Sequence, residues 1–274
     1  MTDMKYMTFN SSCSYAGLAN LLSFYGVDTE DREIAMQMRL PYLFDREDGS
    51  YLAGPMLQGA RWFNLYLRLL GFSLSERQMG REEFCTSFQA GSPVMLGLRF
   101  SPKSKHAVIF TDWRDGKYKF LNNKRKDSPE PETLCLTEKE LLERLDETVV
   151  VGQLERMEPA RIDYRPDLEK SVRTLQSLML EIVDFCITGQ SIFALQKARD
   201  DLFRPILVDG VTMLELLGNA EAEMIGMLKT VRTQFLDVIR AGHSERLEDA
   251  LDMPKLIGPM AYYEHLITER IKLE

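Results

Sequence analysis

The sequence predicts an α+β domain followed by an all-helical domain, and three features support this prediction. Apolar residues recur at helical spacing over 13–26 and 55–71, short β-like segments lie between 94 and 154, and the pattern after residue 167 is almost wholly helical. The expected division is a first domain at 1–156, a linker at 157–166 and a helical bundle at 167–274. Two prolines and mixed charge in the middle segment are typical of a linker.

The composition is that of an ordinary soluble globular protein. The chain has 274 residues, of which 45% are hydrophobic and 28% charged, so it can bury a sizeable core in one large domain or two modest ones. A formal net charge of −8 without a basic stripe argues against nucleic acid as a partner. The sequence shows neither an apolar run of the roughly 18 residues that a membrane span needs nor a secretory signal. We therefore expect a cytoplasmic protein without a membrane span.

The first helix begins beside a cysteine. Its apolar stripe contains Tyr15, Leu18, Ala19, Leu22 and Tyr25, and Gly26 is suited to end it. Ser11 and Ser12 are both suited to be the N-cap, which places Cys13 in the first helical turn. The unpaired N–H groups and the positive end of the helix dipole favour a thiolate at this position.

The remainder of the first domain changes from helical to β periodicity. Further helices are expected at 28–38, 55–71 and 81–89, with an irregular stretch at 40–53. Strands are expected at 94–98, 106–113, 117–122 and 148–154. Asp115-Gly116 is a hairpin signal between the second and third strands, and Thr137 with Glu140 forms a capping-box pattern that opens a helix through Leu145.

The second half consists of strong helix formers. We expect helices at 167–187, 190–203, 210–241, 244–252 and 259–273. The expected breaks are at Gly189, Pro205, Gly242 and Pro254. Such helices can pack as a bundle through their apolar stripes, and self-association through this domain into a homo-oligomer stays open.

The four cysteines predict free thiols rather than disulfides or a metal site. Cys13, Cys85, Cys135 and Cys186 are scattered without a CxxC pair, and only three histidines accompany them. We expect neither a bound metal nor a cofactor. Cys85, Cys135 and Cys186 are interpreted as small buried residues, which leaves Cys13 as the thiol with a chemical role.

Cys13 and His106 form the predicted catalytic pair. An imidazole that reaches the sulfur can deprotonate it, and a third side chain should orient the imidazole. Asn122 is the candidate for that third role, because it ends the strand that is hairpinned to the strand of His106. His243 and His265 are interpreted as surface or packing residues.

These motifs resemble a known group of enzymes. Cys-x-x-x-x-Leu-x-x-Leu-Leu-x-x-Tyr-Gly over 13–26 looks like the nucleophile helix of papain-like bacterial cysteine peptidases that cleave double-glycine leaders. His106-Ala-Val-Ile-Phe-Thr, with Asn122 sixteen positions later, resembles their His…Asp strand pair. Gly91-Ser92-Pro93-Val94 fits a strand found both in these peptidases and in a group of acyltransferases. The chain is also similar to the N-terminal domain of acyltransferases of the butirosin-biosynthesis type. The resemblance covers roughly 8–155 and implies a papain-like fold with a thiol enzyme's activity.

The chain departs from the peptidase pattern at two positions. Those peptidases have a glutamine six residues before the cysteine as a donor to the oxyanion, where this chain has Met7. The oxyanion would then depend on the Cys13 N–H and on Asn10 as a further amide donor. The peptidases have Asp-Pro where this chain has Asn122-Asn123, and asparagine also serves as the orienting residue in papain-like enzymes.

Three functions stay open at this point. The first is a cysteine-dependent hydrolase, with Cys13 attacking an amide or thioester carbonyl and passing through an acyl-enzyme. The second is an acyltransferase that moves an acyl group from a carrier protein to an amine. The third is a peptide-binding module on the same fold without chemistry. The hypothesis leans toward an enzyme, and its partner would be a peptide or an acyl-carrier substrate.

Overall fold

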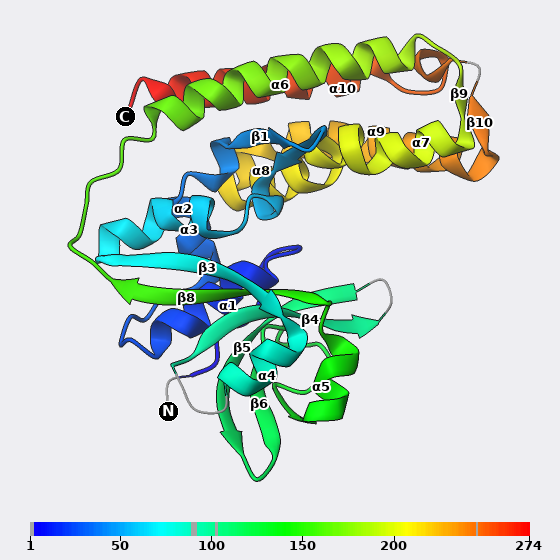
Figure 1. The fold of residues 1–274 in the computed structure, drawn as a ribbon. Coiled ribbons are helices and arrows are strands. Elements are labelled where there is room, and N and C mark those ends of the chain that lie inside the picture. The colour runs from blue at the N-terminus through cyan, green and yellow to red at the C-terminus, as the bar shows by residue number, and fades with distance from the viewer. Residues whose placement is uncertain (1–2, 89–91, 102–103, 245) are drawn as a thin grey trace. The chain divides into compact units, whose positions relative to one another are not determined.

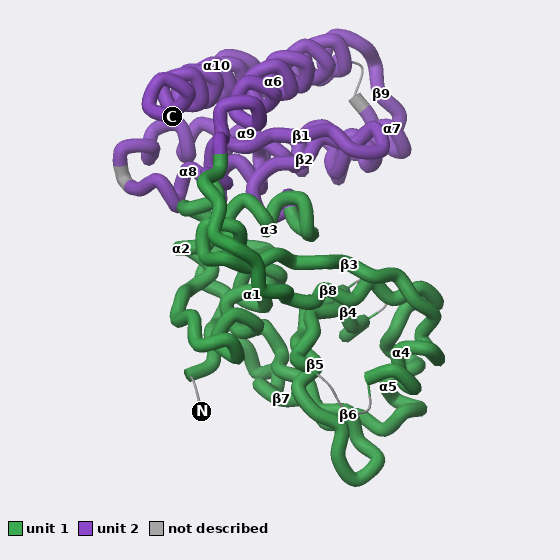
Figure 2. Tube along the Cα trace, turned by 60° about the vertical axis from the view of Figure 1, so that its left-hand side comes forward, with its two compact units in different colours: residues 1–38, 58–162 green, residues 39–57, 163–274 purple. Residues whose placement is uncertain are grey.

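The computed structural model describes residues 3–88, 92–101, 104–244 and 246–274. They form two compact units (Figure 2): a first unit of 1–38 and 58–162, and a second of 39–57 and 163–274. The expected division placed 39–57 in the first domain, whereas the contacts of this segment place it in the second unit. None of the helices among the described residues combines the length and apolar character that a membrane crossing requires.

The first unit is built on a six-stranded antiparallel sheet. The strand order is β3-β8-β4-β5-β6-β7. The strands span Phe72–Gly80 (β3), Val94–Ser101 (β4), Ser104–Arg114 (β5), Lys117–Asn122 (β6), Thr133–Thr137 (β7) and Thr148–Arg156 (β8). All four expected strands are present, and β3 and β7 are additional. Asp115 and Gly116 form the turn between β5 and β6 with φ of 54° and 72°, which matches the hairpin prediction.

Helices cover both faces of this sheet. They span Cys13–Ser23 (α1), Asp31–Gln37 (α2), Ala60–Leu67 (α3), Arg81–Ser87 (α4) and Glu138–Arg144 (α5). Buried residues of α4 and α5 share a core with the side chains on one face of β4, β5 and β6, among them Phe84, Leu141 and Phe110. The opposite face receives α1, where Gly17 lies close to the Met95 side chain.

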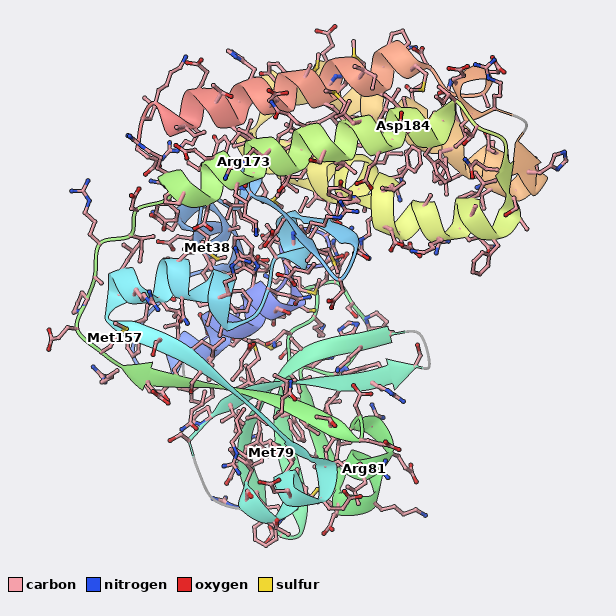
Figure 3. The ribbon with its side chains drawn as sticks, turned by 45° about the horizontal axis from the view of Figure 1, so that its top comes forward. Met38, Met79, Arg81, Met157, Arg173 and Asp184 are labelled. Carbon is pink, nitrogen blue, oxygen red and sulfur yellow. The ribbon has the colours of Figure 1, made fainter. Side chains whose placement is uncertain are left out.

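The short helices begin much as the sequence predicts. Thr137 and Glu140 form the predicted capping box at the start of α5. Figure 3 shows Met79 near the end of β3 and Arg81 at the start of α4, where the chain turns from strand to helix. Two residues used in the sequence prediction, Gln89 and Gly91, lie outside the described residues.

The second unit is largely helical. Its helices span Arg165–Cys186 (α6), Ile192–Ala198 (α7), Val211–Leu217 (α8), Ala222–Ala241 (α9) and Met253–Ile271 (α10). The long helices α6 and α10 lie side by side (Figure 1), and α10 also packs on α9. Short strands at Phe44–Glu47 (β1), Ser50–Ala53 (β2), Gln190–Ser191 (β9) and His243–Ser244 (β10) complete the described part of the unit.

Several expectations for the second unit need correction. The helix expected at 210–241 is two helices, because Gly218 adopts a φ of 116° that ends α8. The chain does not break at Pro205 but continues through π-helical turns over 199–203 and 205–210. Pro254 lies in the first turn of α10, where its missing N–H costs no hydrogen bond, so it starts the helix instead of breaking it. The helix expected at 244–252 is reduced to a 3-10 turn at Leu247–Asp249.

The stretch at 40–53 is a hairpin rather than irregular chain. Residues of β1 pair with those of β2 in register, from Phe44 opposite Ala53 to Glu47 opposite Ser50. The hairpin packs on α6, since the Phe44 N–H donates to Ser171 Oγ at 2.9 Å and the Tyr51 hydroxyl donates to Glu181 at 2.7 Å. These contacts explain why 39–57 belongs to the helical unit.

Candidate functional site

The predicted nucleophile lies at the first residue of α1. Residues 14–22 of this helix are buried, whereas Cys13 itself is half-buried. Ser12 occupies the N-cap position, but its side chain does not cap the helix. Its hydroxyl is 2.7 Å from Asp31 Oδ2 and 2.8 Å from the Phe9 carbonyl oxygen. The N–H groups of the first turn are therefore free of a side-chain cap beside the sulfur.

A buried carboxylate holds the turn that precedes Cys13. Asp31 is fully buried and accepts hydrogen bonds from the Thr8 N–H at 2.7 Å and from the Thr8 hydroxyl at 2.6 Å. It also accepts from Ser12 and from the Arg32 N–H at 2.7 Å. The turn contains Ser11 in the left-handed region with φ of 59°. Asp31 thus fixes the backbone that leads into the nucleophile helix.

Cys13 and His106 line the same cavity of the first unit. The cavity has a volume of about 530 Å³, within the range of small-molecule sites. It lies on the face of the sheet that α1 covers and is also lined by residues of β3, β4, β5 and β8. Its other lining residues include Ser14, Gln58, Gly59, Glu76, Gly97 and Lys105. Cys13 and the backbone of β5 at His106 therefore meet at one cavity.

The imidazole of His106 does not bond to the thiol in this structure. His106 pairs with Leu98 across β4 and β5, and the pleat directs its side chain to the face of the sheet opposite that of Ala107. Its ring lies 4.9 Å from the Phe100 ring, centroid to centroid. Its Nδ1 is buried and has no hydrogen-bond partner among the described residues. Leu98 and Val108, on the same face as His106, belong to the core that α4 and α5 cover, so the imidazole lies on that face. Cys13 and the cavity lie on the opposite face, and turning the ring about its side-chain bonds does not carry it through the sheet to the sulfur.

Asn122 lies on the same face of the sheet as His106. It pairs with Val108, two residues along β5 from the histidine, so the two side chains are diagonal neighbours. Asn122 is fully buried, and its Nδ2 donates to Glu130 at 3.2 Å and to the Pro131 carbonyl at 3.1 Å. Its Oδ1 is buried without a partner among the described residues, as is His106 Nδ1. An unpaired amide oxygen and an unpaired ring nitrogen are complementary groups.

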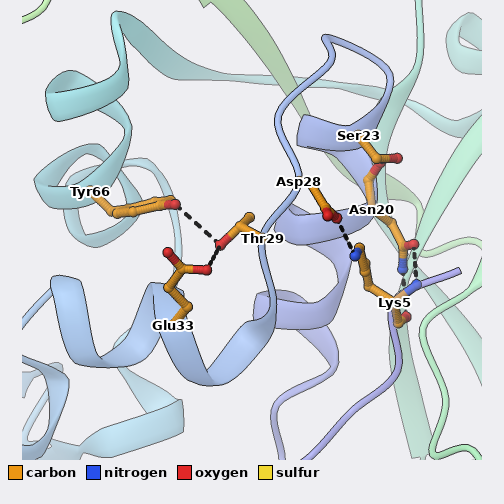
Figure 4. A network of polar contacts seen from close by, with 7 residues as sticks. All are labelled: Lys5, Asn20, Ser23, Asp28, Thr29, Glu33 and Tyr66. Atoms are coloured by element: carbon orange, nitrogen blue, oxygen red, sulfur yellow. Dashed lines mark hydrogen bonds and ion pairs between the residues drawn. The ribbon is translucent and has the colours of Figure 1, made fainter. Parts of the chain in front are cut away.

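Asn123, which has no role in the sequence prediction, connects three elements around the site. Its Nδ2 donates to the Ala107 carbonyl at 2.8 Å, and its Oδ1 accepts from Asn20 of α1 at 3.0 Å. The Asn20 side chain in turn accepts a hydrogen bond from the Lys5 N–H and donates one to the Lys5 carbonyl (Figure 4). Asn123 therefore ties the end of β6 to β5 and to the nucleophile helix.

The proposed oxyanion donor Asn10 is not brought to this cavity. Asn10 is exposed in the turn before α1, and the described residues that line the cavity do not include it. Met7 is half-buried, and its backbone N–H donates to the Lys124 carbonyl at 2.9 Å. The structure offers a different amide, because Gln58 lines the cavity and accepts a hydrogen bond from the Ser14 hydroxyl. Sequence reasoning missed Gln58, which has no local motif around it.

The remaining thiols differ from Cys13 in their surroundings. Burial raises the pKa of the Cys85 thiol and raises that of Cys186 to about 12. Cys135, which we expected to be buried, is exposed on β7. No cluster of three or more His, Cys, Asp or Glu side chains suited to a metal ion occurs in the described part of the chain.

Comparisons with known proteins give likenesses in structure alone. No protein-family model matches the chain, and no curated protein matches its sequence. One similar structure is the peptidase domain of Streptococcus ComA, a bifunctional ABC transporter of a quorum-sensing pathway. The two share 10% identity and a TM-score of 0.40, and the match covers 56% of this chain and 96% of that domain. A double-glycine-motif protease from an AMS/PCAT transporter, solved with its leader peptide, is similar at 12% identity and a TM-score of 0.37 over 54% of this chain and 87% of that one.

A third likeness concerns a protein of another kind. It is a periplasmic domain of the EpsAB fusion protein of the Vibrio vulnificus type II secretion system, at 13% identity and a TM-score of 0.30 over 52% of this chain and 46% of that one. All three scores are low, so the geometry of the site has to support any functional conclusion.

Proposed function

We propose that the protein is a cysteine-dependent hydrolase of the papain-like peptidase type, with Cys13 as nucleophile and with His106 as its base once β5 turns the imidazole toward the cavity. The observation that carries this proposal is that Cys13 lies at the start of α1 and lines a cavity of the first unit. A helix N-terminus without a side-chain cap stabilises a neighbouring thiolate through its N–H groups and dipole. A thiolate there can attack an amide or thioester carbonyl to form an acyl-enzyme.

Asn122 is the proposed orienting residue. Its unpaired Oδ1 can accept from an imidazole N–H and so fix the ring of His106. Both side chains lie on the face of the sheet that α4 and α5 cover, so they can serve Cys13 only if this part of the sheet rearranges to turn them toward the cavity.

A peptide-binding module is the second candidate, and one observation favours it. The His106 ring is held against Phe100 and makes no hydrogen bond with Cys13 among the described residues. If the ring keeps this place when the cavity is filled, the thiol lacks a base. The cavity would then recognise a peptide without cleaving it.

Alkylation with iodoacetamide at about pH 6 separates the two candidates, because an ordinary thiol is less than about 1% ionised there. The enzyme proposal predicts fast, selective alkylation of Cys13, lost in His106→Ala. Cys135 is the internal control, since its thiol is exposed on the same unit. Labelling of Cys13 no faster than that of Cys135, or labelling that His106→Ala leaves unchanged, would support the binding module instead.

The acyl acceptor is a separate question with its own assay. An acyl-enzyme trapped on Cys13 would be released by water in a hydrolase, and by added amines in an acyltransferase. We expect release by water. Release only when an amine is present would assign the acyltransferase reaction.

A further inference from the structure

We propose that Gln58 donates a hydrogen bond from its side-chain amide to the oxyanion formed at Cys13. This inference rests on the proposed thiol chemistry and adds a residue to it. Gln58 precedes Gly59 at the entry to α3 and lines the cavity together with Cys13 and Ser14. It is exposed, as a group that meets a substrate must be.

Ser14 fixes the orientation of the Gln58 amide. Ser14 is the second residue of α1 and is 8% exposed, and its hydroxyl donates to Gln58 Oε1. When the oxygen of an amide is engaged in this way, its NH₂ group remains to donate. No hydrogen bond from Gln58 Nε2 occurs within the part of the chain that the structure describes. Because Ser14 follows Cys13 directly, this free donor is held beside the nucleophile.

A donor at this place has a clear chemical use. When a thiolate adds to a carbonyl, negative charge moves to the carbonyl oxygen, and fixed N–H donors lower the barrier. The first turn of α1 supplies backbone N–H groups without a side-chain cap. A side-chain amide would complete the set, and the methionine at position 7 cannot supply it.

The step can be followed with p-nitrophenyl acetate, which acylates a reactive thiol. The Cys13 thiol loses its proton to a base in solution, the sulfur forms a bond to the acetyl carbon, and the C=O electron pair moves to the oxygen. The C=O bond then re-forms and p-nitrophenolate leaves with its electron pair, which leaves an acetyl thioester on Cys13. Iodoacetamide instead alkylates the same sulfur by displacing iodide, without an oxyanion.

The two reagents therefore separate an oxyanion donor from a group that activates the thiol. We expect Gln58→Met, which keeps the length of the side chain but removes its donor, to slow acylation by roughly 10²–10³-fold. Its rate of alkylation by iodoacetamide should equal that of the unmodified protein. Gln153→Met is the matched control, because Gln153 is exposed on β8 and does not line the cavity.

Ser14→Ala tests the positioning of the amide. It should slow acylation less than Gln58→Met does, since the donor remains but is no longer fixed, and it should leave alkylation unchanged. Circular dichroism checks that each variant is folded.

Three results would overturn the inference. Equal slowing of acylation and alkylation in Gln58→Met would mean that Gln58 acts on the thiolate. Unchanged acylation in Gln58→Met would mean that the oxyanion does not meet it. If Cys13 of the unmodified protein is neither acylated nor selectively alkylated, the proposed thiol chemistry fails, and the role of Gln58 fails with it.

Discussion

Asp31→Asn should weaken the turn that carries the nucleophile and lower the stability of the protein. Each oxygen of this fully buried carboxylate accepts two hydrogen bonds: Oδ1 from the Thr8 hydroxyl and the Arg32 N–H, Oδ2 from the Thr8 N–H and the Ser12 hydroxyl. An asparagine replaces one oxygen with an NH₂ group, which donates and cannot accept. Whichever oxygen is replaced, two donors lose their acceptor.

The size of the loss follows from these contacts. A hydrogen bond to a charged group contributes about 1.5–3 kcal/mol, and an unpaired buried donor costs about 1–3 kcal/mol. Ser12 can recover part of the loss, since its hydroxyl also lies 2.8 Å from the Phe9 carbonyl oxygen. We therefore expect Asp31→Asn to lower the free energy of unfolding by about 2–4 kcal/mol, measured by urea denaturation at pH 7.

Asp28→Asn is the matched control for this experiment. Asp28 pairs with Lys5, but its side chain is 86% exposed, and exposed ion pairs contribute about 0–1 kcal/mol. A loss of unfolding free energy in Asp31→Asn no larger than that in Asp28→Asn would refute the role of Asp31 in holding the turn before α1. The rate of Cys13 alkylation should also fall in Asp31→Asn and not in Asp28→Asn, because only Asp31 holds the turn before the helix.

Two further predictions concern buried positions. Burial raises the pKa of Asp209 from 3.8 to about 6, so the folded state binds this proton more tightly than the unfolded state and loses stability as pH rises from about 4 to 6. Asp209→Asn should make the free energy of unfolding fall by about 2–3 kcal/mol less over this pH range, and an unchanged pH dependence of urea unfolding would contradict this. A Cβ at Gly17 of α1 would lie 2.6 Å from Asn123 Nδ2 and 3.0 Å from Met95 Sδ, so Gly17→Ala should destabilise the protein by about 1–3 kcal/mol. Gly226→Ala in α9 should stabilise it by up to about 1 kcal/mol, because the new Cβ would meet no described atom beyond its own helix within 4 Å, and equal effects in thermal melts would refute the close packing.

The elements that could be predicted carry their signals locally. The apolar stripe after Cys13, the Asp115-Gly116 turn and the capping box at Thr137 each lie within a few residues, and the corresponding helix, hairpin and helix start are all present. Asp48-Gly49 carries the same turn signal, with φ of 49° and 84° between β1 and β2. That hairpin could therefore have been predicted from the sequence as well.

Of the two missed strands of the six-stranded sheet, β7 carries a local signal, since buried leucines at 134 and 136 alternate with exposed residues. The strand β3 lacks such a signal, because pairing rather than burial defines it. Four consecutive residues of β3, at 75–78, are exposed, so no alternation marks the strand, and it is held by its pairing with β8 along its whole length. Similarly, the assignment of 39–57 to the second unit depends on contacts with residues more than a hundred positions away, such as Ser171. Contacts of that length leave no periodicity in the sequence.

The candidate site shows the same limit at the level of side chains. Order and spacing predicted that the Cys13 sulfur and the His106 imidazole would meet. Both residues line one cavity, but the pleat of β5 turns the imidazole to the other face of the sheet, where it lies on Phe100. Asn10 is near Cys13 in sequence but absent from the described cavity lining, whereas Gln58 is distant in sequence and belongs to it. A donor to an oxyanion needs a position in space and a fixed orientation, and a side chain from any segment can meet both requirements. For that reason, the lack of a glutamine at position 7 does not by itself argue against catalysis when Ser14 holds another amide at the same cavity.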